Sequence, residues 1–92
     1  MQEAEEKKEK GTEFGRFIKQ QRKRLNLNQQ QASDIAGIHL TQWSTYEAGK
    51  SPAGMTIATL GKFAKALRIH PSVLIAVIFK DNPFAWEGEL PE

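Results

Sequence analysis

Residues 28–49 read NQQQASDIAGIHLTQWSTYEAG and predict two short helices joined at Gly37. Glycine tolerates a positive φ, which a tight turn between two helices requires. The first of these helices also has small residues, which allow a second helix to cross it closely at a steep angle: Ala32, Ser33 and Ala36. The stretch therefore predicts a helix-turn-helix motif.

The second helix of this motif is expected to have an inner and an outer side. Trp43 and Tyr46 lie three residues apart and should face the core. The other positions should face outward and are short or neutral polar, apart from one leucine and one histidine: His39, Leu40, Thr41, Gln42, Ser44 and Thr45. Such side chains let a helix approach DNA base edges, so the pattern favours DNA binding over a plain helical hairpin in a small α-domain.

The charge of the chain is unevenly distributed. The 92 residues carry a formal net charge of +2, but residues 12–80 alone carry +7. The first eleven residues carry −1 and residues 81–92 carry −4. A cationic body favours a polyanionic partner, although lysines and arginines on helices are also often only a solvated surface.

The pattern of the chain predicts an all-α protein with five helices and three regions: a flexible charged N-terminal segment over residues 1–11, a helix-turn-helix domain over residues 12–80, and an acidic aromatic tail over residues 81–92. Thr12 is the expected N-cap of the first helix, and Asn26 its expected end. Asn28-x-x-Gln31 is a capping-box variant that opens the second helix.

The second half of the domain is expected to hold two more helices. Residues 48–55 contain two glycines and a proline and predict a loop. After Thr56 as N-cap, apolar residues recur at helical spacing and form the expected inner face of the fourth helix: Ile57, Leu60, Phe63, Ala64 and Leu67. The fifth helix should run from Pro71 to about Phe79.

The fifth helix is apolar around its whole circumference, so the core can cover only one of its faces. Something must cover the other face. The cover is either the tail, with Phe84 and Trp86, or the same helix of a second subunit. We favour the second subunit because a two-fold protein matches the symmetry of a duplex operator. The expected dimer interface consists of Val73, Val77, Ile78 and Phe79.

The composition gives no support for other classes of protein. The chain has no cysteine, and its two histidines, His39 and His70, are too distant to form a convincing metal site. No carboxylate pair, activated nucleophile or phosphate-binding glycine loop stands out, so we expect neither an enzyme nor a cofactor. The longest apolar run, residues 73–79, is too short to span a bilayer. We expect a cytoplasmic protein.

The segments RKRLNLNQQQASDIAG (residues 22–37) and WSTYEAGK (residues 43–50) resemble the lambda-repressor and Cro-like helix-turn-helix family, also called the xenobiotic-response-element family of bacterial and phage regulators. The resemblance covers about residues 14–78. It implies a compact five-helix domain that binds double-stranded DNA. It also implies a protein of bacterial or phage origin that is associated with the nucleoid. This chain differs from the usual pattern in having Trp43 at an aliphatic position, His39 at a Ser or Thr position, and Ile35 at a commonly charged position.

The resemblance also implies roles for individual residues. Arg22 and Glu47 would form a structural ion pair between the first helix and the recognition helix. Leu40, Thr41 and Thr45 fall on base-reading positions, with Gln42 and Ser44 beside them, although Leu40 could also lie partly in the core. Gln29 falls on the position of a family glutamine that touches a phosphate and steadies the recognition helix. The expected backbone-contacting set is Asn28, Gln29, His39, Lys50 and Ser51.

The sequence is consistent with two functions. The first is a sequence-specific transcriptional regulator, a homodimeric repressor that binds an inverted repeat through the major groove. The alternative is a protein-interaction module, an antitoxin or an antirepressor, that binds a partner through its acidic aromatic tail. The two roles overlap, since an antitoxin can also repress its own operon.

Overall fold

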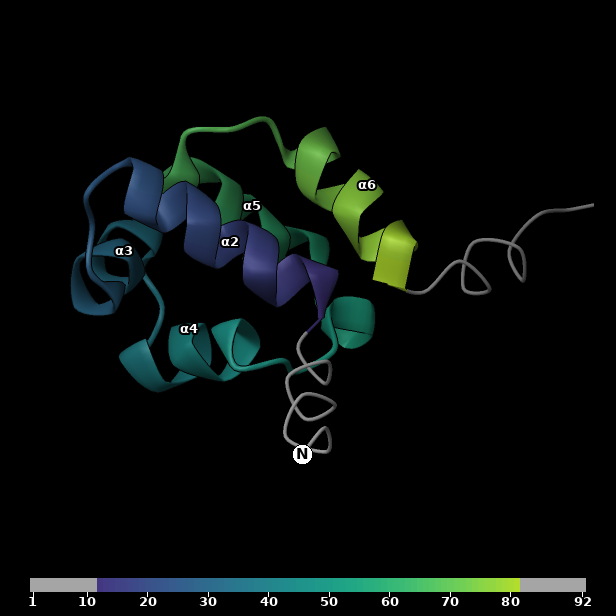
Figure 1. The fold of residues 1–92 in the computed structure, drawn as a ribbon, viewed down its shortest axis with the longest axis horizontal. Coiled ribbons are helices and arrows are strands. Elements are labelled where there is room, and N and C mark those ends of the chain that lie inside the picture. Colours follow the sequence, from purple (N-terminus) through teal and green to yellow (C-terminus); the bar gives the residue numbers. More distant parts are fainter. Residues whose placement is uncertain (1–11, 82–92) are drawn as a thin grey trace, which may run out of the picture.

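The computed structural model describes residues 12–81, which form five α-helices and one short 3-10 helix (Figure 1). In chain order these are α2 (Glu13–Arg24), α3 (Gln29–Ala36), α4 (Leu40–Glu47), η1 (Pro52–Gly54), α5 (Ile57–Leu67) and α6 (Pro71–Asp81). The described residues contain no strand, so the predicted all-α fold with five helices is confirmed. The predicted N-terminal segment, and all of the predicted tail beyond Asp81, lie outside the described residues.

α2 runs through the middle of the molecule and packs against α4, α5 and α6 (Figure 1). α3 packs against α4 and α5 near the C-terminal end of α2, and α6 lies at the opposite end of the domain. In the view of Figure 1, α4 lies below α2 and has no helix beneath it. This arrangement leaves one long side of α4 uncovered by the other described helices.

Polar side chains cap three of the helices where the sequence predicts. The Thr12 hydroxyl accepts a hydrogen bond of 2.8 Å from the Gly15 amide at the start of α2. A complete capping box opens α3, with the Asn28 side chain accepting from the Gln31 amide at 2.7 Å and the Gln31 side chain accepting from the Asn28 amide at 2.8 Å. Thr56 caps α5 in the same way as Thr12 caps α2. These starts are set locally, because each cap satisfies amides that have no partner within the helix.

Residues with a positive φ follow four of the described helices, and Gly49 after α4 has a φ of 123°. Gly37 ends α3 with a φ of 78°, and Asn26 follows α2 with a φ of 59°, so both predicted turn residues are confirmed. Arg68 ends α5 with a φ of 57°, which the sequence did not predict, since arginine rarely adopts this conformation.

Aromatic rings form the centre of the core. The Phe63 ring lies 5.6 Å from the Phe14 ring, 4.6 Å from the Trp43 ring and 5.6 Å from the Tyr46 ring, measured between centroids. Trp43, Phe14 and Phe63 are fully buried. The inner side of α4 is thereby fixed against α2 and α5, and the prediction that Trp43 and Tyr46 face the core is confirmed.

Gly15 lets α2 approach α4 closely. A Cβ atom at this position would lie 2.6 Å from the Tyr46 carbonyl oxygen and 3.1 Å from the Glu47 carbonyl oxygen. A Cβ contact of 2.6 Å with a backbone oxygen is shorter than real side chains make, so any larger residue at position 15 would force the two helices apart. The first turn of α2 thus fixes the position of the C-terminal turn of α4.

Three sequence predictions for the second half of the domain need correction. Ile57 was expected on the inner face of α5 but is 76% exposed, because it is the first residue of the helix and lies beyond the edge of the core. The predicted loop over residues 48–55 contains the helical turn η1, which buries Pro52. α6 continues to Asp81, two residues past the predicted end.

α6 covers the core with only part of its surface. Leu74 is fully buried, and Val77 and Ile78 are partly buried against the core of this same chain. Val73 and Ile75 remain 41% and 37% exposed. Phe79, the fourth residue of the predicted dimer interface, is half-buried. Among residues 12–81, no helix is both long and apolar enough to cross a membrane.

Candidate nucleic-acid interface

The outer face of α4 consists of small or polar side chains that do little for the fold. Thr41 and Thr45 are exposed and Leu40 is 39% exposed, so the leucine does not belong to the core. Gln42 and Ser44 are half-buried at the two edges of this face. The structure therefore gathers the five predicted base-contacting residues on one accessible surface of an eight-residue helix.

The hydroxyl groups on this face are oriented by their own helix. The Thr45 hydroxyl donates to the Thr41 carbonyl oxygen at 2.7 Å, and the Ser44 hydroxyl donates to the same oxygen at 3.2 Å. A hydroxyl that donates its hydrogen to the backbone keeps its lone pairs free to accept from another group. In this state, the face is better suited to accept hydrogen bonds, as from the amino groups of adenine and cytosine, than to donate them.

A bidentate ion pair joins the C-terminal end of α4 to α2. Arg22 Nε donates to Glu47 Oε2 at 2.6 Å, and a second nitrogen of the same guanidinium donates to Glu47 Oε1 at 2.9 Å. The two side chains are only 10% and 4% exposed. The third guanidinium nitrogen donates to the Leu27 carbonyl oxygen at 2.8 Å. One arginine thus connects α2, the turn after it and α4.

The Glu47 carboxylate also accepts two further hydrogen bonds. Gln29 Nε2 donates to Oε1 at 3.0 Å, and the Trp43 indole nitrogen donates to Oε2 at 2.6 Å. We call these four residues, Arg22, Gln29, Trp43 and Glu47, the Glu47 junction. It links α2, α3 and α4 through a single carboxylate, and within residues 12–81 no buried side-chain nitrogen or oxygen lacks a partner.

Trp43 has a role in this junction that sequence reasoning missed. A buried indole needs an acceptor for its N–H group, and Glu47 lies one helical turn further along α4. That spacing of four residues, with the tryptophan at a usually aliphatic position, was the available signal. Gln29 was expected to contact a phosphate and to steady the recognition helix. Its Nε2 donates to Glu47 at the end of α4, and the phosphate contact stays a prediction.

Burial and hydrogen bonding act in opposite directions on the Glu47 carboxylate. Desolvation is the largest single influence and by itself raises the pKa. The hydrogen bonds from Arg22, Gln29 and Trp43, together with the charge of Arg22, outweigh it and hold the pKa of Glu47 below its ordinary value. The pKa of Arg22 is raised, chiefly by its hydrogen bonds to Glu47 and against the effect of burial. Both groups are therefore charged at neutral pH.

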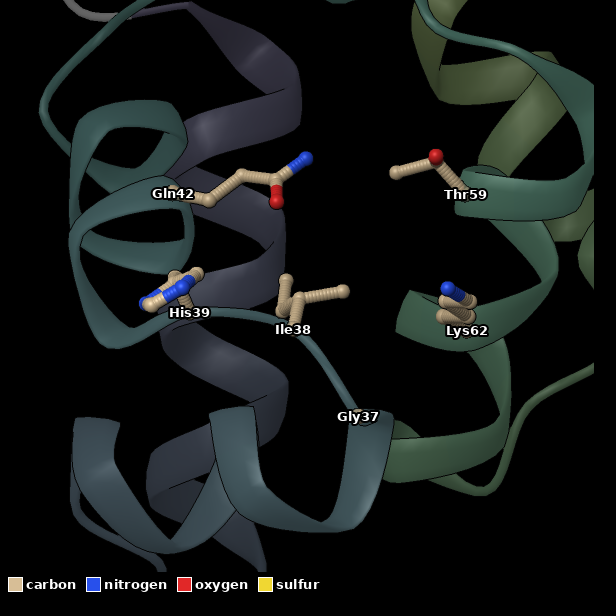
Figure 2. A pocket seen from close by; sticks show the side chains of 6 residues that line it. All are labelled: Gly37, Ile38, His39, Gln42, Thr59 and Lys62. Atoms are coloured by element: carbon tan, nitrogen blue, oxygen red, sulfur yellow. The ribbon is translucent and has the colours of Figure 1, made fainter.

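A cleft lies on each edge of the outer face of α4. The first, which we call the α4–α5 cleft, has a volume of about 370 Å³ and is lined by Gly37, Ile38, His39, Gln42, Thr59 and Lys62. Figure 2 shows Gln42 extending from α4 toward Thr59 of α5, with Lys62 on the α5 side. The second, which we call the α2–α4 cleft, has a volume of about 300 Å³ and is lined by Lys19, Arg22, Lys23, Gln29, Ser44, Glu47 and Ala48.

The sequence matches the family model of MqsA, the antitoxin component of a bacterial toxin-antitoxin system, over residues 2–78. The chain belongs to this antitoxin family. No curated protein matches the sequence. The likeness of the chain to lambda-repressor and Cro-like proteins stays a resemblance, based on the residues quoted above.

Two of the remaining predicted backbone-contacting residues, His39 and Lys50, flank α4 in the chain. His39 is exposed at the N-cap of α4 and makes no side-chain capping bond, so the first amides of this helix have no side-chain acceptor. Lys50 is exposed, with its Nζ 5.3 Å from the centre of the Tyr46 ring. The side chains of Asn28 and Ser51 are engaged in local caps. Among the described residues, no group of three His, Cys, Asp or Glu side chains could hold a metal ion.

Proposed function

We propose that this antitoxin binds DNA in a sequence-specific manner by inserting the outer face of α4 into the major groove. The observation that carries the proposal is the contrast within this helix: the Glu47 junction and the aromatic core fix its inner side, and its outer side is exposed and made of short side chains. A helix that reads base edges needs a fixed position and an outer face that can approach closely.

The proposed contacts follow from the chemistry of this face. Leu40 and the methyl groups of Thr41 and Thr45 suit the methyl group of thymine, and Gln42 suits adenine. Lys50, Ser51, His39 and the amides at Asn28 and Gln29 suit the phosphate backbone. The face has no arginine, so a bidentate contact to guanine is not part of the proposal.

The test is selection of bound DNA from a random pool, followed by affinity measurements on the recovered sequence. We expect an inverted repeat with half-sites about 34 Å apart, one turn of B-DNA. The double variant Thr41→Ala, Thr45→Ala should lose sequence preference, with about 1 to 3 kcal/mol for each lost base contact. Gln20→Ala, an exposed residue of α2, is the matched control. Recovery of no preferred sequence would overturn the proposal.

We further propose that the antitoxin acts in the cytoplasm as a homodimeric repressor whose interface includes α6. Val73 and Ile75, exposed on this helix, support the proposal, since a second copy would cover them. Replacing Val73 by Asp should convert the dimer to a monomer in light scattering and weaken binding to the full operator more than to a half-site. If the wild type is monomeric at micromolar concentration and binds a single half-site, the dimer proposal fails.

The second proposed function is capture of a protein toxin, which the family match favours. The acidic aromatic segment of residues 82–92 lies outside the described residues, and its sequence suits a basic partner. Deleting it should release a copurifying toxin and leave operator binding intact. Retention of the toxin by the shortened chain would assign capture to another surface. We propose no enzymatic activity and no cofactor for either role.

A further inference from the structure

The two clefts beside α4 lie on opposite edges of its outer face. Gln42 lines the α4–α5 cleft and Ser44 lines the α2–α4 cleft. Successive residues of an α-helix are rotated by about 100°, so positions 42 and 44 are separated by about 200° around the axis. A helix that presents Thr41 and Thr45 to the base edges would therefore have one cleft toward each side of the groove.

Each cleft is lined by lysines from a neighbouring helix. Lys62 of α5 lines the α4–α5 cleft, and no carboxylate lines that cleft (Figure 2). Lys19 and Lys23 of α2 line the α2–α4 cleft, where the one carboxylate, that of Glu47, is already engaged by Arg22. Within the described part of the chain, none of these three lysines forms an ion pair.

The major groove has a matching distribution of charge. It is about 12 Å wide and is bounded by two rows of phosphates, one from each strand. A helix about 10 to 12 Å in diameter with its side chains fills that width. Cations on opposite sides of such a helix therefore face different strands of the duplex.

We propose that Lys62 binds a backbone phosphate of one DNA strand and that Lys19 and Lys23 bind phosphates of the other strand. α5, which is not part of the helix-turn-helix, thereby becomes part of the DNA interface. The inference rests on the proposed DNA binding and adds to it the position and strand of the phosphate contacts. The ligand is a phosphodiester held by charge and hydrogen bonds from the ammonium groups.

The test compares Lys62→Ala and Lys19→Ala with Lys65→Ala in the full chain. Lys65 is the matched control, because it is an exposed lysine of α5 that lines a separate pocket with Leu25, Leu27 and Ile35. Affinity for the selected operator is measured by fluorescence anisotropy across a salt series. Each phosphate contact that is lost should reduce the magnitude of the negative slope of log K against log salt concentration by about 0.9. We expect that change for Lys62→Ala and Lys19→Ala and none for Lys65→Ala, with unchanged thermal unfolding for all three.

Strand assignment comes from single methylphosphonate substitutions, which neutralise one phosphate at a time. Within one half-site, the phosphate whose neutralisation weakens the wild type but not Lys62→Ala should lie on the opposite strand from the phosphate defined in the same way with Lys19→Ala. Equal slopes for Lys62→Ala and Lys65→Ala, or both phosphates on the same strand of that half-site, would overturn this inference and leave the proposed function standing. Absence of any operator preference in the wild type would instead overturn the proposed function.

Discussion

The inner and outer faces of α4 differ in burial and in the contacts that their side chains make. On the inner face, Trp43 and Tyr46 are buried among aromatic rings, and Glu47 accepts four hydrogen bonds from three helices. On the outer face, Thr41 and Thr45 are exposed, and the Thr45 hydroxyl donates to the Thr41 carbonyl oxygen within the helix itself. The fold therefore depends on the inner face of α4, and the outer face is available for binding.

Removing the carboxylate should produce the largest loss of stability. Glu47→Ala leaves the buried Arg22 guanidinium without its partner, and breaking a buried ion pair in this way costs about 3 to 5 kcal/mol. Urea denaturation followed by circular dichroism measures the change. Glu13→Ala is the control, since Glu13 pairs with Arg16 on the surface, and such pairs contribute less than about 1 kcal/mol. Equal losses for the two variants would show that the Glu47 junction does not hold α4.

Acid should lower the folding stability through the Glu47 carboxylate, which holds the inner face of α4. The pKa of Glu47 is lower in the folded chain than its ordinary value of 4.5, so the stability it contributes is fully present above about pH 4.5. That contribution is lost as the pH falls through the lower pKa of the folded state. Glu47→Gln does not titrate at this position, so the difference in stability between wild type and variant should narrow as the solution is acidified. A difference that stays constant from pH 7 to pH 3 would contradict the assignment.

Trp43→Phe should have a smaller effect on the inner face than Glu47→Ala. The substitution removes the indole N–H that Glu47 accepts, and a hydrogen bond to a charged group contributes about 1.5 to 3 kcal/mol. A double-mutant cycle with Glu47→Gln separates this bond from the loss of packing. If the two substitutions are additive in free energy of unfolding, the indole hydrogen bond contributes nothing measurable.

The outer face should tolerate change with the smallest effect on stability. Thr41→Ala and Thr45→Ala alter exposed side chains, so each should change the free energy of unfolding by no more than about 0.5 kcal/mol. The measurement is the same urea titration, on the variants already used for DNA binding. A loss above about 1 kcal/mol for either would mean that this face also supports the fold.

Local signals predicted the helices well, and their limits explain the errors. Thr12, Asn28 and Thr56 cap helices as expected because each cap joins groups two or three residues apart. Ile57 was wrongly assigned to the inner face, since spacing alone does not show where the core ends. Gly15 was not singled out, because its close approach to the α4 carbonyls depends on how α2 and α4 cross.

The sequence by itself determined the five helices, the turn at Gly37 and the composition of the outer face of α4, because caps, turns and periodicity are properties of neighbouring residues. The resemblance added the pairing of Arg22 with Glu47, and the structure places these two side chains in contact. Only the tertiary structure decided that Gln29 and Trp43 share that carboxylate and that lysines of α2 and α5 line the two edges of α4. Most of these contacts join residues far apart in the chain, and packing in three dimensions decides them all.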